Sequence, residues 1–184
     1  MGWQQTIFEG LWIFEPKIFG DNRGYFFESF NQKNLPEELQ HVVFVQDNEA
    51  KSSFGVIRGL HYQLPPFAQA KLVRVISGEV LDVVVDVRNA SKTYGKSFSL
   101  VLNDTNKKQI FVPRGFAHGY AVLSDEVVFA YKCDNYYSPA HEAGLFYNDP
   151  ALQINWMLPE ENMLLAERDK KWPPFGQHEI FNHD

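Results

Sequence analysis

The feature that most constrains this chain is a series of short β-rich segments with turn residues between them. Ser77 and Gly78, for example, form a good two-residue hairpin turn between apolar runs. Residues 71–76 and 79–87 flank this turn, residues 97–102 and 109–113 flank a second predicted hairpin turn, and residues 116–123 and 127–133 are two more expected strands. Short strands with turn signals at this spacing predict an all-β sandwich or barrel. No long helices alternate with the strands, which excludes a doubly wound sheet.

Length and composition agree with one β-rich domain over residues 1–184. The 184 residues suffice for a real core, and 45% apolar and 15% aromatic residues favour strands and exclude disorder. Only short helices are expected, over residues 31–40 and 159–165. From about residue 172 we predict a C-terminal extension that is either an arm or disordered.

Charge and cysteine content restrict the partners and the compartment. The net charge of −6 argues against a general nucleic-acid binder. Cys133 is the single cysteine, which rules out an internal disulfide framework and fits a reducing compartment. We find no signal peptide and no apolar stretch long enough to cross a bilayer. The sequence therefore predicts a cytoplasmic protein that binds neither membranes nor nucleic acids.

The strand over residues 55–63 carries the most reactive set of side chains. His61 is a candidate general base, because an unperturbed imidazole titrates near ~6.5. Arg58 suits phosphate oxygens, and Lys71 suits a point where negative charge develops. Ideal alternation places Arg58 and His61 on opposite faces of the strand. A bulge at Gly59 would re-aim one of them.

Residues 113–118 have the Pro-x-Gly-x-x-His spacing of the second cupin motif. This similarity supports a cupin jelly roll, that is, a double-stranded β-helix, with short peripheral helices. Cupins often bind a metal through two His and a Glu of an earlier motif together with the last His, here His118. The earlier strand instead reads His61, Tyr62, Gln63, and no Glu follows at the usual distance. We therefore expect no metal ion.

Three further side chains each allow two interpretations. Tyr131 shares a strand face with apolar neighbours and is either a core tyrosine or a general acid that faces His61 across a ligand. Tyr137 either packs at a strand end or stacks on a planar ring. Asp169 lies in a charge run that is normally solvated, unless it accepts a hydrogen bond from His61 and fixes its tautomer.

Two more segments place polar side chains on one face of an expected strand. In a strand expected over residues 25–30, Glu28 lies between two Phe on one face. The β-rich run over residues 42–48 ends with Gln46 and Asn48 on one face. The position of Glu28 is unusual unless it meets a partner or a ligand.

Taken together, these segments resemble the dTDP-4-dehydrorhamnose 3,5-epimerases of the cupin superfamily. The similarity extends from about residue 8 to residue 169. Its most specific pieces are residues 23–28, 46–48, 58–63, 70–73 and 115–119, completed by Tyr131 and residues 136–139 and 148–150.

The resemblance implies a homodimer of jelly-roll subunits without cofactor or metal, whose active sites are shared across the interface. It implies epimerisation of dTDP-4-dehydro-6-deoxy-D-glucose (dTDP-4-keto-6-deoxyglucose) at C3 and C5 through an enolate. The product would be dTDP-4-dehydro-L-rhamnose, in dTDP-L-rhamnose biosynthesis.

The resemblance also implies roles for single residues. The catalytic set is His61 as general base, Asp169 as its carboxylate partner, Tyr131 as the acid of the opposite face and Lys71 as the group that stabilises the enolate oxygen. Around the sugar and phosphates lie Arg58 and His118, and on the nucleotide side Gln46, Asp47, Asn48, Glu142 and Tyr137, the last stacked on thymine. The partner subunit supplies Arg23 and Glu28, with Phe26 on the same face. Arg168 stands where the family has Lys, so the charge is kept but the geometry of its contact differs.

Other functions stay open at this point. One is a monoepimerase that acts only at C3 or only at C5 of a related dTDP-4-keto-6-deoxysugar. Another is a non-catalytic cupin that binds nucleotide sugars, although such a protein needs no acid–base pair. A metal-dependent cupin isomerase or dioxygenase is disfavoured by the missing ligands.

Overall fold

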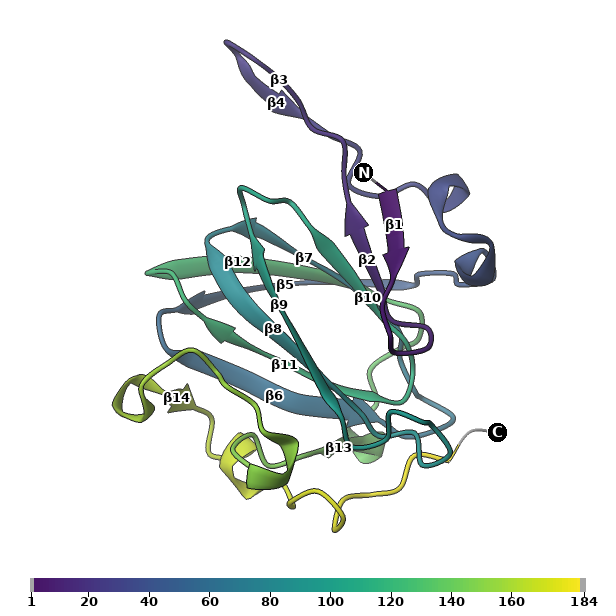
Figure 1. Cartoon of the computed structure of the whole chain (residues 1–184), viewed down its shortest axis with the longest axis vertical. Coiled ribbons are helices and arrows are strands. Elements are labelled where there is room, and N and C mark those ends of the chain that lie inside the picture. Colours follow the sequence, from purple (N-terminus) through teal and green to yellow (C-terminus); the bar gives the residue numbers. More distant parts are fainter. Residues whose placement is uncertain (1, 183–184) are drawn as a thin grey trace.

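Two antiparallel sheets packed face to face make up the body of the protein. The computed structural model describes residues 2–182 (Figure 1). The first sheet consists, in spatial order, of β1 (Gly2–Gln5), β2 (Trp12–Glu15), β10 (Gln109–Val112), β7 (Lys71–Ser77), β12 (Glu126–Cys133) and β5 (Gln46–Ser53). The second consists of β13 (Glu142–Gly144), β6 (Val56–Gln63), β11 (Phe116–Val122), β8 (Glu79–Asp86) and β9 (Ser97–Asn103), and β14 (Leu164–Leu165) runs parallel to β6. The predicted all-β architecture is therefore confirmed. The two predicted hairpins, residues 71–76 with 79–87 and 97–102 with 109–113, were wrong. β7 and β10 belong to the first sheet, whereas β8 and β9 belong to the second, so each turn crosses from one sheet to the other.

The only helices among the described residues are short 3-10 turns. They are η1 (Gln32–Asn34), η2 (Glu37–Leu39), η3 (Pro139–His141), η4 (Pro150–Leu152), η5 (Glu160–Asn162) and η6 (Asp169–Lys171). The helix expected over residues 31–40 is split in two at Pro36, which lacks the N–H that a continuous helix needs. The helix expected over residues 159–165 is only η5, and β14 follows it. No helix within residues 2–182 is long and apolar enough to span a membrane.

A two-stranded hairpin, β3 (Phe19–Asp21) and β4 (Gly24–Phe26), projects from the body as an arm (Figure 1). The strand predicted over residues 25–30 was therefore wrong beyond Phe26. Glu28 follows the strand and accepts hydrogen bonds from Asn31 and Asn34 at 3.1 and 2.6 Å. The strand predicted over residues 42–48 was also misplaced, because β5 begins only at Gln46.

Two of the three clusters of the core meet at β8, because this strand is buried on both of its faces. Val80 and Val84 pack between the sheets with Phe129 of β12. Val83 and Val85 point the other way and pack under the C-terminal third of the chain. Those four valines are fully buried. A strand that is covered on both sides reads as a nearly continuous apolar run, which explains the sequence of β8.

The chain after residue 172 packs against the body. Pro173 accepts a hydrogen bond from the Phe146 N–H at 2.9 Å, and Asp149 accepts one from the Phe175 N–H at 2.6 Å. Phe181 is buried and forms a parallel bridge with Arg88. The expectation of a free arm or disorder was thus wrong for residues 173–182, and residues 183–184 lie outside the described part.

Candidate active site

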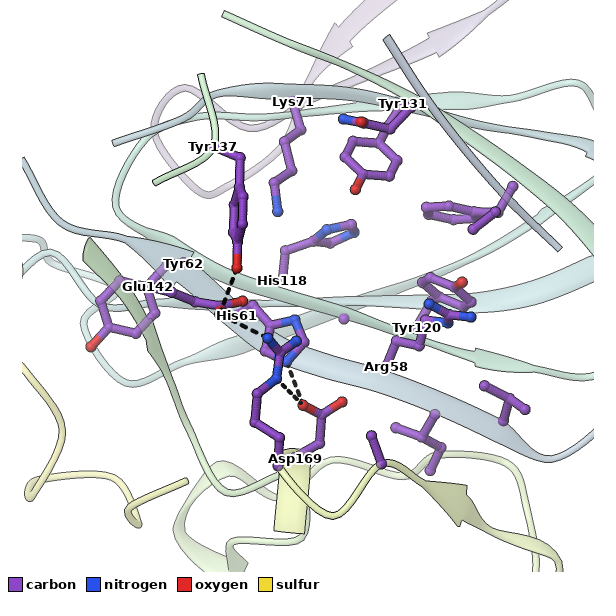
Figure 2. A pocket seen from close by; sticks show the side chains of 18 of the residues that line it. Arg58, His61, Tyr62, Lys71, His118, Tyr120, Tyr131, Tyr137, Glu142 and Asp169 are labelled. Carbon is purple, nitrogen blue, oxygen red and sulfur yellow. Dashed lines mark hydrogen bonds and ion pairs between the residues drawn. The ribbon is translucent and has the colours of Figure 1, made fainter. Parts of the chain in front are cut away.

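A cavity of about 660 Å³ opens between the two sheets. Its walls come from β5, β7 and β12 of the first sheet and from β6 and β11 of the second, and the segment from β14 to η6 closes one side (Figure 2). This volume lies in the range of sites that bind small organic ligands. The cavity therefore brings together side chains from distant parts of the sequence.

His61 and Asp169 form a hydrogen-bonded pair at one wall of the cavity. Their Nε2 and Oδ1 atoms are 2.8 Å apart, and Asp169 is almost completely buried (Figure 2). Burial disfavours the charge of Asp169, but the hydrogen bond and charge of His61, the Gly59 N–H and Arg168 outweigh it and lower the pKa of the carboxyl group. An ionised carboxylate can only accept, so Nε2 of His61 carries the proton. Nδ1 is then the nitrogen that is able to take up another.

A bulge in β6 turns Arg58 and His61 to the same cavity. His61 pairs with His118 of β11 and Arg58 pairs with Tyr120, so three steps along β6 face two steps along β11. The proposed bulge at Gly59 is thereby confirmed. Gly59 has a φ of 133°, and a Cβ there would lie 2.5 Å from the Cα of Gly119. Only glycine allows this approach of the two strands.

Lys71 and Tyr131 lie on the opposite wall, on the first sheet. The Nζ atom of Lys71 lies 5.8 Å from the centre of the Tyr131 ring. Within the described residues, neither Nζ nor the Tyr131 hydroxyl has a protein hydrogen-bond partner. Burial lowers the pKa of Lys71, against the opposing charges of Cys133, Asp82 and Glu142. Burial also raises the pKa of Tyr131 to about 12, so its hydroxyl stays protonated at neutral pH.

His118 forms a second histidine–carboxylate pair on β11. Its Nε2 atom lies 2.9 Å from Oδ2 of Asp82, and both residues are buried. Asp82 was not predicted from the sequence as the partner of His118. A carboxylate inside the apolar run of β8 was the available signal, because a buried charge needs a partner. Its partner is 36 residues away in the sequence, so the signal did not identify it.

A polar cluster closes the outer end of the cavity. Glu142 of β13 accepts hydrogen bonds from the Tyr137 hydroxyl at 3.1 Å and from Nη1 of Arg168 at 2.8 Å (Figure 2). Nε of Arg168 also lies 3.4 Å from Oδ1 of Asp169. Arg168 thus connects the cluster to the His61 pair. The Tyr137 ring is half exposed, which leaves one face accessible to a ligand.

Gln46 and Asn48 extend this end of the cavity along β5. Nε2 of Gln46 donates to Oδ1 of Asn48 at 2.9 Å, which confirms that the two side chains share a face. Asn48 in turn lies 3.7 Å from Sγ of Cys133. Asp47 points to the other face of the sheet, where it pairs with Lys132 at 2.8 Å. It therefore does not line the cavity.

The three residues expected near the nucleotide on the arm also lie outside the cavity. Arg23 forms an exposed ion pair with Asp21 at 2.6 Å. Phe26 is 70% exposed, and Glu28 bonds to neighbouring asparagines of its own segment. Any role for Arg23, Phe26 or Glu28 at the cavity requires a second subunit.

Gln63, which stands where a metal-binding cupin has histidine, holds the loop beside the cavity. Its Oε1 accepts from the Ser138 N–H at 2.6 Å, and its Nε2 donates to the carbonyl of Phe67 at 2.6 Å. Within residues 2–182, no three His, Cys, Asp or Glu side chains converge where they could hold a metal ion.

The sequence matches the family described as dTDP-4-dehydrorhamnose 3,5-epimerase over residues 5–177. It is 51% identical to the dTDP-4-dehydrorhamnose 3,5-epimerase of Shigella flexneri over 178 residues, which covers 96% of this chain and 97% of that protein.

Two solved structures show the same fold. The dTDP-6-deoxy-D-glucose-3,5-epimerase of Legionella pneumophila, in complex with dTDP-4-keto-L-rhamnose, superposes with a TM-score of 0.93 at 43% identity, covering 100% of this chain and 98% of that one. The dTDP-4-dehydrorhamnose 3,5-epimerase of Bacillus anthracis, with TDP and PPi bound, gives a TM-score of 0.88 at 41% identity, covering 93% and 97%. The predicted cupin jelly roll is confirmed by these likenesses.

Proposed function

The chain belongs to the dTDP-4-dehydrorhamnose 3,5-epimerase family, and on this premise we propose which of its side chains perform each step. It is an isomerase of dTDP-L-rhamnose biosynthesis. The role of each side chain in the epimerisation follows from the geometry of the cavity and from the chemistry of a 4-keto sugar.

The reaction needs a base, a cation and an acid around one ketone. Hydrogens on C3 and C5 are acidic because both carbons are α to the C4 carbonyl, so loss of either proton gives an enolate. Return of a proton to the other face of the carbon inverts it. No electrons are transferred overall, and the proposal therefore includes neither a redox cofactor nor a metal ion.

His61 removes the proton with Nδ1, the nitrogen that its bond to Asp169 leaves free. Asp169 holds the ring in this tautomer and stabilises the imidazolium that forms. The 2.8 Å contact between the two residues beside the cavity is the observation that carries the proposal.

Lys71 stabilises the enolate oxygen from the opposite wall. Its ammonium group is desolvated and has no carboxylate partner among the described residues. The negative charge that balances this ammonium group appears only when the enolate oxygen forms. That difference between ground state and transition state is what lowers a barrier.

Tyr131 returns a proton from the side opposite His61. The two residues lie on different sheets and both line the cavity, so a sugar ring bound between the sheets has one on each face. The high pKa of the Tyr131 hydroxyl keeps its proton in place until the enolate is formed.

The rest of the cavity binds the dTDP group. The relatives bind dTDP-4-keto-L-rhamnose and TDP, and we place the pyrophosphate near Arg58 and His118. Tyr137, held by Glu142, stacks on the thymine, with Gln46 and Asn48 alongside. Arg168 holds the side chains at this end of the cavity in place through its bonds to Glu142 and Asp169.

The site is completed by a second subunit. The arm leaves the body with Phe19, Tyr25 and Phe26 more than half exposed, which is unfavourable for an isolated chain. In a homodimer the arm reaches the partner's cavity and brings Arg23 to the nucleotide.

Incubation with dTDP-4-keto-6-deoxyglucose in deuterated water tests the proposal. We expect NMR to show deuterium at both C3 and C5, together with formation of dTDP-4-keto-L-rhamnose. The matched variant His61→Asn should incorporate none. Label at only one carbon would indicate a monoepimerase, and absence of label with the wild-type protein would leave a nucleotide-sugar-binding protein.

A further inference from the structure

Trp172 packs its indole against the imidazole of the proposed base. Its ring centroid lies 6.0 Å from that of His61 at an interplanar angle of 66°, an edge-to-face arrangement. Asp169 lines the cavity, whereas Trp172 does not. The imidazole is therefore held between a carboxylate, an indole and the substrate space.

The local backbone explains why Asp169 and Trp172 both reach His61. They lie three residues apart, at the first residue and the C-cap of η6. The turn is fixed by hydrogen bonds from the Asp169 N–H to Ala166 and from the Lys171 N–H to Arg168, at 2.9 and 3.0 Å. Side chains three residues apart in a 3-10 turn lie on the same side of it.

The neighbouring strand leaves room for the indole. Gly144 of β13 is the register partner of His61 on β6. A Cβ at Gly144 would lie 2.5 Å from Cδ2 of Trp172, so the indole lies directly on the glycine backbone. Trp172 thus covers the strand pair at the position of the base.

The buried indole N–H of Trp172 is unfavourable for stability, so stability does not explain why a tryptophan occupies this position. Nε1 of Trp172 is buried without a hydrogen-bond partner among the described residues. A buried donor without a partner is unfavourable, and a phenylalanine would avoid this cost. Trp156, which is buried in the core, shows the usual arrangement, because its Nε1 donates to the Tyr147 carbonyl at 3.0 Å.

We propose that Trp172 is a positioning residue for the epimerisation: it fixes the plane of the His61 ring and shields the His61–Asp169 hydrogen bond from bulk water. The inference rests on the role of His61 proposed above. Trp172 touches neither substrate nor reacting atoms and acts only through the imidazole. A base that swings by even a fraction of an ångström loses alignment with the C–H bond, and misplacement of about 1 Å can cost on the order of 10² in rate.

The test compares Trp172→Ala and Trp172→Phe with Trp156→Phe as matched control. We expect kcat to fall roughly 10- to 100-fold for Trp172→Ala and less for Trp172→Phe, with KM changed by less than about twofold, because the substrate contacts remain. Trp156→Phe makes the same change from an indole to a phenyl ring and also removes a satisfied hydrogen bond, but it should keep the wild-type kcat.

A second measurement reports on shielding directly. In 15N-imidazole NMR spectra, exchange of the His61 Nε2 proton with water should accelerate in both Trp172 variants and stay unchanged in Trp156→Phe. Wild-type kcat and exchange in Trp172→Ala would overturn the proposal, as would an equal loss of kcat in Trp156→Phe. If Trp172→Ala does not fold, Trp172→Phe decides.

The two proposals fail in different ways. If the wild-type protein does not epimerise the nucleotide sugar, the proposed function is wrong, yet the exchange of the imidazole proton still shows whether Trp172 shields His61. If the wild type is active and the Trp172 variants match it in both measurements, only the role of Trp172 is wrong.

Discussion

Single side chains of the cavity differ in how firmly the protein holds them. His61 is fixed by Asp169, His118 by Asp82, and Tyr137 by Glu142. Lys71 and Tyr131 have no such partner among the described residues. The groups that must keep a defined orientation are therefore pre-organised, whereas the two on the facing wall are free to bond to the ligand.

At this scale, replacement of one hydroxyl separates proton removal from inversion. Tyr131→Phe keeps the ring and its packing against Phe129 but removes the proposed acid. We expect solvent deuterium to enter the substrate with retention, because His61 is able to remove and return a proton on its own side. Inversion should fall by roughly 10²–10⁴, the usual effect of one general acid.

NMR that follows exchange and inversion separately provides the measurement, with circular dichroism as a check of folding. Equal loss of exchange and inversion would show that Tyr131 is not a separate acid. Near-normal inversion would make it an ordinary core tyrosine.

Among the elements, β6 determines the shape of the site through one glycine. In the Gly59→Ala variant the new Cβ would lie 2.5 Å from the Cα of Gly119, which is a steric clash. The bulge and the register of β6 with β11 must therefore change. Because the bulge turns Arg58 and His61 to the same cavity, we expect kcat/KM to fall by about 10² or more.

Gly176→Ala is the control for this variant. Gly176 also has a positive φ, 88°, but a Cβ there meets no atom within 4 Å. It should cost on the order of 1 kcal/mol of stability and leave the activity unchanged. Thermal unfolding together with steady-state kinetics distinguishes the two; full activity in Gly59→Ala would contradict the role of the bulge.

The predictability of these elements from sequence depended on how local their signals were. The turn at Ser77 and Gly78 was predictable because its signal lies in one short stretch, but the pairing across it was not, because β7 and β8 belong to different sheets. The glycine in β6 suggested a bulge because its signal is equally local. The arm was not predictable: β3 and β4 have few contacts with the body, so no burial pattern marks them.

Residues of the candidate site were predictable where they belong to a recognisable motif. They were not predictable where only the fold brings two distant residues into contact. His61, Lys71 and Tyr131 were found from the chemistry of their side chains and from the family resemblance. The pairing of Asp82 with His118 depends on the register of β8 and β11, and the contact of Trp172 with His61 depends on how the C-terminal third folds back. Neither contact produces a periodic pattern in the sequence.

For the whole molecule, the arm predicts that two subunits share each site. Arg23→Ala should weaken nucleotide binding although Arg23 is far from its own cavity. In a mixture of inactive Arg23→Ala and inactive His61→Asn proteins, each mixed dimer contains one site with both residues intact. Random exchange in an equal mixture then restores about a quarter of the sites.

Assays at low substrate concentration, with sedimentation to establish the dimer and subunit exchange, provide this test. A monomer in sedimentation would contradict the shared site. Absence of restored activity despite demonstrated exchange of subunits would do the same.

The position of Asp169 after both sheets in the chain has a consequence for synthesis on the ribosome. A nascent chain that has already released β6 and its base still lacks the carboxylate that orients it. The barrel strands are therefore able to pair first, and the C-terminal segment then docks on the edge of β6 through the hydrogen bond from the Leu164 N–H to Gly55 at 2.8 Å. We therefore expect catalytic competence to arise only after residue 169 has emerged, and a chain interrupted before it to lack the activity that depends on the proposed His61–Asp169 pair.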